Sequence, residues 1–176
     1  LMTGFCVEPQ PKALVSLFGY GDIVGPWYSR PDPFYSSQPA VPKEEAYSVV
    51  GGPVVSEGGG KRGRFYLYLR QHGLWPNEVA GHDPEKEPRW FDRYCPVRNV
   101  TKKYPPTVLI HGDKDTDVPY EQSVLMAKEL ARVGVRHELI TIPGGGHGFG
   151  GYDKPEVVVK AYERAVQFAT EAQRKT

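Results

Sequence analysis

The chain has 176 residues, which is long enough for one domain with a buried core. Its 22 basic and 21 acidic residues leave a formal charge of +1, so no overall charge draws it to nucleic acid or to an anionic membrane. No apolar stretch approaches the roughly 20 residues of a membrane-spanning helix, and the first residues lack a signal-peptide pattern. Two cysteines make no disulfide framework, which favours a reducing, cytoplasmic compartment.

The first half of the chain predicts one strand followed by a long irregular segment. Residues 13–18 (ALVSLF) are apolar and end at a Gly-Tyr-Gly turn, as a short buried strand would. From about residue 26 to residue 104 the pattern is irregular, with one predicted helix at 64–71 and a shorter one near 76–80. Sustained alternation of apolar and polar residues is absent, so no second sheet is expected there.

The second half predicts a regular strand–helix–strand–helix unit. Strands are expected at 107–110 and 137–142, and helices at 120–133 and at about 155–174. Pro119 suits the first turn of the first helix, and Gly134 suits its left-handed end. Short loops between these elements imply a right-handed parallel unit, hence an α/β fold.

Two chemically capable side chains follow the two strands of this unit. Asp115 lies in HGDKDTDVP after the first strand, and His147 lies in PGGGHGF after the second. The carboxyl ends of parallel strands share one edge of a sheet, where ligands bind, so residues 32 apart in sequence can come within hydrogen-bond reach. A carboxylate that orients an imidazole forms the acid and base of a catalytic triad.

The residues alone leave other roles open for both side chains. A loop histidine is often simply exposed, and an aspartate before a helix is often an N-cap or turn residue. Asp113 and Asp117 are alternative candidates for the acid, and Asp117 is also a good N-cap candidate.

Residues 104–149, YPPTVLIHGDKDTDVPYEQSVLMAKELARVGVRHELITIPGGGHGF, resemble the C-terminal part of α/β-hydrolases, most closely the prolyl oligopeptidase-like branch and its esterase relatives. In that family H-G-x-x-D-x-x-V-P carries the triad acid, which falls on Asp115, and the histidine of G-H-G-F is the base, which falls on His147. The resemblance implies three parallel strands with flanking helices, forming a single partial domain over 1–176. It also implies a cap-like insertion at about 26–104 and cleavage of an ester or peptide bond by acyl transfer. The ligand motifs of the sequence indicate no cofactor and no metal.

No residue of the chain matches the serine nucleophile that this chemistry requires. The G-x-S-x-G pattern is absent from the sequence. Cys6 has half of such an elbow, but residues 7–12 are too few for a parallel crossover, and Pro9 and Pro11 prevent a helix there. The serines considered lie inside a predicted strand or helix or lack elbow glycines: Ser16, Ser123, Ser29, Ser36, Ser37, Ser48 and Ser56.

The expected explanation is that the chain is the C-terminal portion of a larger hydrolase. Residues 1–5 look like the end of the helix after the elbow in these enzymes, which makes 13–18 the sixth strand and places the serine upstream of Leu1. The isolated chain would then be inactive, and the open edge of its sixth strand would favour self-association or pairing with the missing portion. The alternatives are an inactive or split-gene product that acts as a binding or complementing module, and a Cys6 thiol hydrolase. The expected partner of the full-length enzyme is a small ester or peptide, with no nucleic acid and no membrane.

Aromatic residues concentrate in the irregular segment. Twelve of the 21 aromatic residues, including all three tryptophans, lie between residues 27 and 94. We expect most of them to pack the segment together, with one or two lining an acyl or aromatic substrate pocket. The candidates are Trp27, Tyr28, Tyr66, Tyr68, Trp75 and Trp90.

Other ligand motifs fail on their own requirements. The glycines from Gly19 to Gly25 have the wrong spacing for a dinucleotide, and Pro26 denies the helix that would follow. The aspartates from Asp113 to Asp117 resemble a calcium loop, but Val118 stands where its glycine is needed. Five scattered histidines show no metal-ligand spacing.

Overall fold

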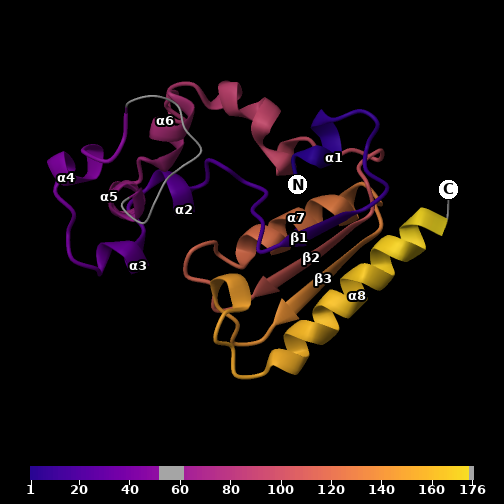
Figure 1. Ribbon diagram of the computed structural model, residues 1–176. Coiled ribbons are helices and arrows are strands. Elements are labelled where there is room, and N and C mark those ends of the chain that lie inside the picture. The colour runs from indigo at the N-terminus through magenta and orange to yellow at the C-terminus, as the bar shows by residue number, and fades with distance from the viewer. Residues whose placement is uncertain (52–61, 175–176) are drawn as a thin grey trace. The chain divides into compact units, whose positions relative to one another are not determined.

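The computed structural model describes residues 1–51 and 62–174, and Ser56 lies outside them (Figure 1). The chain divides into two compact units, one formed by Leu1–Asp22 with Asp92–Thr176 and one formed by Ile23–Phe91. Among the described residues, no helix is both long enough and apolar enough to cross a membrane.

The first unit is built on a parallel sheet of three strands, β1 (Leu14–Leu17), β2 (Thr107–Gly112) and β3 (His137–Ile142), in the order β1-β2-β3 (Figure 1). All three predicted strands are confirmed. β2 extends two residues beyond its predicted end because His111 and Gly112 still pair with Thr141 and Ile142 of β3. Every residue of β2 is buried, as expected for the central strand of a covered parallel sheet.

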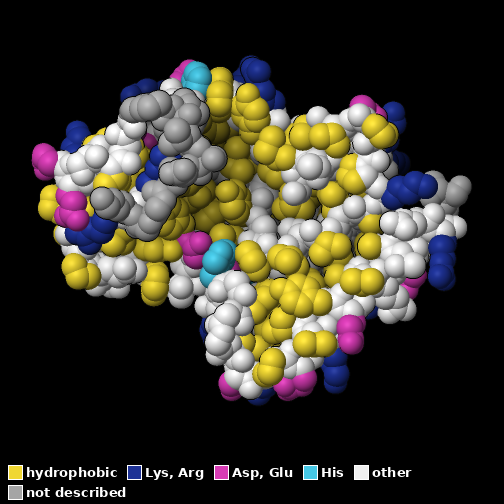
Figure 2. Space-filling view, in the orientation of Figure 1, with side chains coloured by type: hydrophobic (Ala, Val, Ile, Leu, Met, Phe, Trp, Pro, Cys, Tyr) yellow, Lys and Arg dark blue, Asp and Glu magenta, His cyan; other side chains and the backbone are white. Residues whose placement is uncertain are grey.

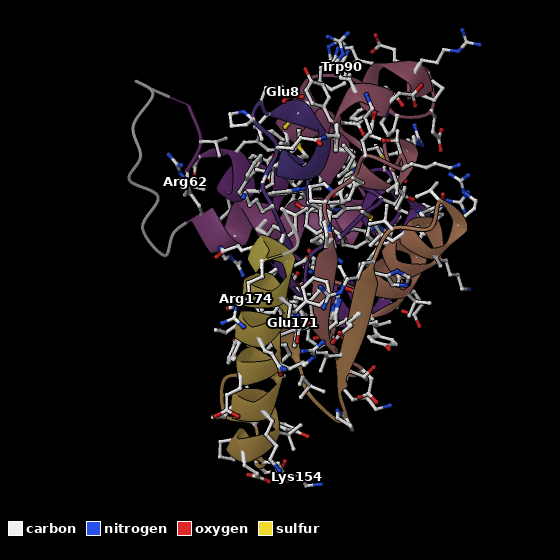
Figure 3. All side chains as sticks on the ribbon, turned by 90° about the vertical axis from the view of Figure 1, so that its right-hand side faces the viewer. Glu8, Arg62, Trp90, Lys154, Glu171 and Arg174 are labelled. Carbon is white, nitrogen blue, oxygen red and sulfur yellow. The ribbon has the colours of Figure 1, made fainter. Side chains whose placement is uncertain are left out.

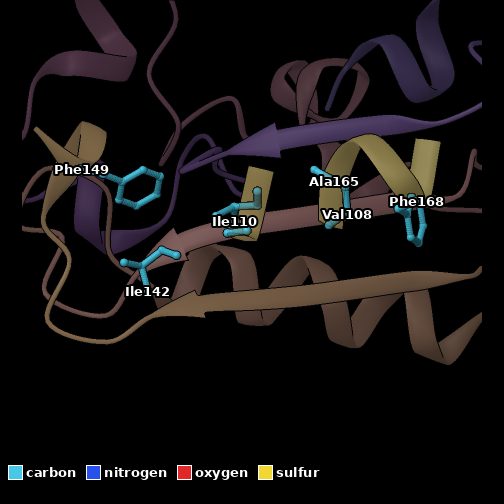
Figure 4. Packing of buried hydrophobic residues seen from close by; sticks show 7 residues of the cluster. Val108, Ile110, Ile142, Phe149, Ala165 and Phe168 are labelled. Atoms are coloured by element: carbon cyan, nitrogen blue, oxygen red, sulfur yellow. The ribbon is translucent and has the colours of Figure 1, made fainter. Parts of the chain in front are cut away.

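Two long helices, α7 (Glu121–Arg132) and α8 (Pro155–Arg174), cover opposite faces of this sheet. Val108 and Ile110 pack against Phe168 of α8 in one cluster, shown in Figure 4, and Leu109 packs against α7 in the other. This split follows from the alternation of side chains along a strand. Both predicted helices are confirmed to within one residue, and Gly134 has the predicted left-handed φ of 76° after α7.

The rest of the first unit consists of short elements. A four-residue helix, α1 (Thr3–Cys6), precedes β1, and Gly4 packs on the ring of Tyr104, whose hydroxyl donates to the Leu1 carbonyl at 2.6 Å. Two 3₁₀ helices, Pro96–Arg98 and His147–Phe149, lie before β2 and after β3. Because Tyr104 stands just before β2, α1 lies at the amino ends of the strands.

The described residues of the second unit form short helices joined by turns and loops, and no strand. It contains α2 (Pro26–Ser29), α3 (Pro33–Ser36), α4 (Lys43–Tyr47), α5 (Gly63–His72) and α6 (Trp75–Ala80), and a 3₁₀ helix, Pro88–Tyr94, crosses its boundary. The two predicted helices are confirmed as α5 and α6. The one-turn helices α2 and α3 were not predicted; each begins with a proline, whose fixed φ suits the first helical position.

The compact unit Ile23–Phe91 does not have the bounds of the predicted insertion at about 26–104. Residues 92–104 belong to the first unit, where Tyr104 and Val100 join the cluster around Leu109. That this helical unit serves as a cap stays a prediction.

A buried arginine organises part of the second unit. Arg70 of α5 is 1% exposed, and its guanidinium donates to Asp32 Oδ2 and to the Tyr66 hydroxyl, both at 2.7 Å. Four aromatic rings have their centroids 4.6–5.7 Å from this group, those of Trp27, Tyr28, Tyr35 and Tyr66. Several aromatics singled out in the sequence therefore pack around a buried charge.

Candidate active site

Asp115 and His147 meet at the carboxyl edge of the sheet. Nδ1 of His147 lies 2.9 Å from Oδ2 of Asp115, within hydrogen-bond distance. Asp115 belongs to the loop after β2, and its side chain has no exposed surface; His147 begins the 3₁₀ helix after β3, and 37% of its side chain is exposed. The parallel topology therefore brings the two predicted residues together with a buried carboxylate and an accessible imidazole.

The loops that carry these two residues are joined through their backbones. A Cβ on Gly112 would lie 2.1 Å from the carbonyl oxygen of Gly145, so this position accepts only glycine without a shift of the backbone. The Lys114 amide donates to that same carbonyl at 3.0 Å, and the Gly144 amide donates to Asp113 Oδ1 at 2.6 Å. Asp113, an alternative candidate for the acid, therefore binds the backbone of the histidine loop.

Four donors surround the Asp115 carboxylate. Oδ1 accepts from the amides of Asp117 and Val118, both at 2.9 Å. Oδ2 accepts from His147 and, at 3.2 Å, from Nε2 of His111. Burial by itself would raise the pKa of this carboxyl, but the hydrogen bonds from the two histidines and the two amides outweigh it and hold the pKa below its usual value. Asp115 is therefore fully charged at neutral pH.

Asp117 lies on the other side of the imidazole. Its Oδ2 is 3.6 Å from Nε2 of His147, the nitrogen that faces away from Asp115. The N-cap of α7 is Tyr120, without a capping side-chain bond, so Asp117 does not cap that helix as the sequence allowed. It places a second carboxylate near the ring nitrogen that a base would use.

His111 is a site residue that the sequence interpretation missed. It is fully buried on β2, with Nδ1 2.7 Å from the Ser123 hydroxyl and Nε2 2.9 Å from the Val118 carbonyl, in addition to its bond with Asp115. A histidine inside an otherwise apolar strand, four residues before the acid, was the available signal. Ser123 is buried and hydrogen-bonded to this imidazole, so its hydroxyl is unsuitable as a nucleophile.

Two phenylalanines also adjoin His147. The ring of Phe18, which follows β1, meets the imidazole edge-on at 4.6 Å between centroids and meets the Phe149 ring at 5.4 Å. Phe18 and Phe149 have φ of 42° and 56°, values that bulky residues rarely adopt. Such backbone strain persists where the surroundings hold it, and it is common at functional sites.

Cys6 lies away from this site. It ends α1, which lies at the amino ends of the strands, whereas His147 lies at their carboxyl ends. The six residues of β2 separate these two edges by about 20 Å at the usual rise of a strand. The position of Cys6 therefore argues against the Cys6 thiol hydrolase.

Two of the aromatic residues singled out in the sequence border a cavity in the second unit, and their role in a substrate pocket stays a prediction. Tyr66 and Trp75 border a cavity of about 580 Å³ together with Phe65, Arg62 and Val50. Trp90 lies at another surface hollow and stacks on His82, with 4.0 Å between ring centroids. Figure 3 labels both Arg62 and Trp90.

Comparison with known proteins decides the family. Residues 64–176, well over half of the chain, match the prolyl oligopeptidase family, and the match includes Asp115 and His147. The chain belongs to the prolyl oligopeptidase family. This is a family of serine hydrolases and their esterase relatives, as the resemblance of residues 104–149 implied.

Relatives and solved structures agree with this assignment. The chain is 34% identical to Esterase LipC of Mycobacterium tuberculosis over 91 residues, which are 51% of this chain and 21% of that esterase. A Staphylococcus aureus protein of unknown function has a TM-score of 0.61 at 17% identity, over 91% of this chain and 56% of its own. A puromycin-hydrolyzing peptidase of M. tuberculosis has a TM-score of 0.51 at 20% identity, over 91% and 18%.

These likenesses confirm the predicted fold, which is a partial α/β-hydrolase fold of three parallel strands with flanking helices. The chain spans about a fifth of the length of the curated esterase that it matches.

Proposed function

We propose that Asp115 and His147 are the acid and the base of a serine hydrolase that cleaves an ester or an amide, and that the nucleophile comes from outside these 176 residues. The 2.9 Å contact between His147 Nδ1 and the buried Asp115 carboxylate carries this proposal. A buried carboxylate bonded to Nδ1 fixes the imidazole tautomer, so that Nε2, with Asp117 Oδ2 3.6 Å away, is the nitrogen that exchanges protons.

The proposed reaction uses Nε2 of His147 first as base and then as acid in each of its two halves. It takes the proton of the serine hydroxyl as the serine oxygen attacks the carbonyl carbon, and it gives that proton to the departing alcohol or amine as the acyl-enzyme forms. Water then attacks the acyl-enzyme by the same route and releases the acid. Throughout, Asp115 stays ionised and stabilises the positive charge on the imidazole.

The nucleophile is assigned outside the chain because the candidates inside it are unsuitable. Ser16 lies in β1, Ser123 is bonded to His111, and Cys6 lies at the opposite edge of the sheet. We also propose a cytoplasmic location, because the described residues hold Cys6 and Cys95 without a disulfide, as in a reducing compartment.

The test is complementation with a segment that carries a family nucleophile elbow. We expect a mixture of the chain and this segment to react with a fluorophosphonate probe and to hydrolyse a p-nitrophenyl ester. The isolated chain is expected to do neither. His147→Ala removes both activities from the mixture, and His82→Ala, which changes a half-buried histidine of the second unit, retains them. Turnover by the isolated chain that depends on His147 would place the nucleophile inside it. Stable binding of the segment without labelling would favour the binding-module alternative.

The same proposal predicts a partner along β1, the edge strand of the described sheet. In a parallel pair alternate residues point their amides to one neighbour, and Leu14 and Phe18 donate to the β2 side. Val15 and Leu17 therefore point their amides away from β2. An open edge of this kind is a template for another strand.

Apolar side chains continue from this edge onto α8. Arg164 pairs with Glu138 of β3, and Glu171 pairs with Arg136, which directly precedes β3. These two side chains of α8 therefore lie on its β3 side; Figure 3 labels Glu171. The helical period places Val159, Tyr162 and Val166 on the opposite flank, toward β1, where all three are exposed. Figure 2 shows hydrophobic side chains gathered over the region of β1 and α8. We propose that a second copy of the chain covers this surface when the missing portion is absent.

Val166→Lys is expected to shift the isolated chain toward monomer, because a charge would be buried in the contact between copies. The measurement is sedimentation velocity over a tenfold range of concentration. Val79→Lys is the matched control, since Val79 is 64% exposed on α6 and Val166 is 68% exposed on α8. A wild-type chain that stays monomeric over this range would contradict the proposal.

A further inference from the structure

The buried imidazole of His111 is hydrogen-bonded to Asp115. We propose that His111 is a positioning residue for the Asp115–His147 pair, in which a neutral imidazole protonated on Nε2 holds the Asp115 carboxylate turned toward His147. The proposal builds on the proposed function, but its test needs no catalysis. His111 does not contact His147 directly and acts only through the carboxylate that they share.

The partners of His111 determine where its proton lies. Nε2 faces two acceptors, Asp115 Oδ2 at 3.2 Å and the Val118 carbonyl at 2.9 Å, and neither can donate, so Nε2 carries the hydrogen. Nδ1 faces the Ser123 hydroxyl at 2.7 Å. The other acceptor near that hydroxyl, the Gly19 carbonyl, is at 3.5 Å, too far to compete. The hydroxyl therefore donates to Nδ1, which is the arrangement of the tautomer that we propose.

His111 thereby joins three segments of the first unit around one carboxylate. It stands on β2, receives a bond from Ser123 on α7, and donates to both Val118 and Asp115 in the loop between them. Rotation of the Asp115 carboxylate would break its bonds to His111 and His147 and to two backbone amides together. His111 therefore helps to fix the orientation of Asp115, and through Asp115 the orientation of the His147 imidazole.

The charges around Asp115 make the effect measurable. The groups that face it are His111 of β2, His147 of the 3₁₀ helix and Asp117 of its own loop, while the Tyr120 ring stands edge-on to His111 at 5.8 Å. Burial raises the pKa of the Asp115 carboxyl, and the bond from His111 is the largest contribution that offsets burial. Loss of this donor should therefore raise that pKa.

The test is NMR on the 176-residue chain with ¹⁵N-labelled imidazoles and ¹³C-labelled carboxylates. In the wild-type protein we expect His111 to carry its single hydrogen on Nε2 at neutral pH. His111→Leu should raise the pKa of Asp115 by about one pH unit, a tenfold change in proton affinity, and broaden the His147 Nδ1 hydrogen. His111→Gln, whose amide offers an N–H near the place of Nε2, should restore both signals.

Two results would overturn the inference. One is a doubly protonated or Nδ1-protonated His111 in the wild-type chain at neutral pH, which needs no variant that folds. The other is an Asp115 titration that is the same in the wild type, His111→Leu and His111→Gln. If the Asp115 pKa shifts as expected but no added segment restores hydrolysis, the proposed function fails and the role of His111 stands. If a segment restores hydrolysis but the Asp115 pKa is the same in all three proteins, the role of His111 fails and the proposed function stands.

Discussion

Asp115→Asn is expected to lower kcat of the complemented hydrolase by about 10⁴-fold, with folding retained. An asparagine amide turned toward His147 would donate to Nδ1 and force the imidazole hydrogen onto Nε2. In that tautomer Nε2 cannot accept the serine proton. Turned the other way, the asparagine NH₂ group would face the two backbone amides that now donate to Oδ1, so hydrogen-bond donors would face each other. Neither orientation reproduces the carboxylate.

The matched control is Asp113→Asn, two residues away in the same loop. Asp113 accepts one bond, from the Gly144 amide, and an asparagine oxygen can accept the same bond. We expect its kcat to stay within a few-fold of the wild type in the same p-nitrophenyl ester assay. Equal losses in the two variants would show that Asp115 acts through the fold of the loop and not as the acid.

Arg70→Ala is expected to destabilise the second unit by about 3–5 kcal/mol, a large fraction of the stability of a small domain. The substitution leaves Asp32, whose side chain is 11% exposed, without its cation and empties the space between four aromatic rings. Removing one partner of a buried ion pair costs far more than the net worth of the pair. Urea unfolding followed by tryptophan fluorescence suits the measurement, because Trp27, Trp75 and Trp90 all lie in this unit.

Arg64→Ala supplies the comparison on the same helix. Arg64 pairs with Glu45 at 2.6 Å, but both side chains are more than 40% exposed. Water and salt screen such a pair, so its loss should move the unfolding midpoint little. Similar midpoints for Arg70→Ala and Arg64→Ala would mean that the aromatic packing, and not the buried charge, holds this unit together.

The sequence predicted the part of the fold that repeats a simple period. The strands and helices from residue 107 onward follow from apolar periodicity, and the parallel topology then brings Asp115 next to His147. Helices of one turn, such as α2 and α3, carry no period that could reveal them. Arg70 was missed because an arginine on a helix is usually at the surface.

The finer parts of the site could not be predicted for a different reason. His111 and Ser123 are 12 residues apart and meet only because β2 and α7 pack face to face. The left-handed φ of Phe18 is set by its surroundings, since nothing in the residue type favours it. These features depend on tertiary contacts, whereas the acid–base pair depends on strand topology.

The backbone bonds between the loops after β2 and β3 have a consequence for how this family can vary. Residues 107–149 supply both reacting side chains, the glycine contact between their loops and every hydrogen bond that orients the carboxylate. One continuous segment of the chain thus supplies all the hydrogen bonds that hold this acid–base pair. Substitutions in the helical unit Ile23–Phe91 are therefore expected to leave the hydrogen bonds of the Asp115 carboxylate unchanged.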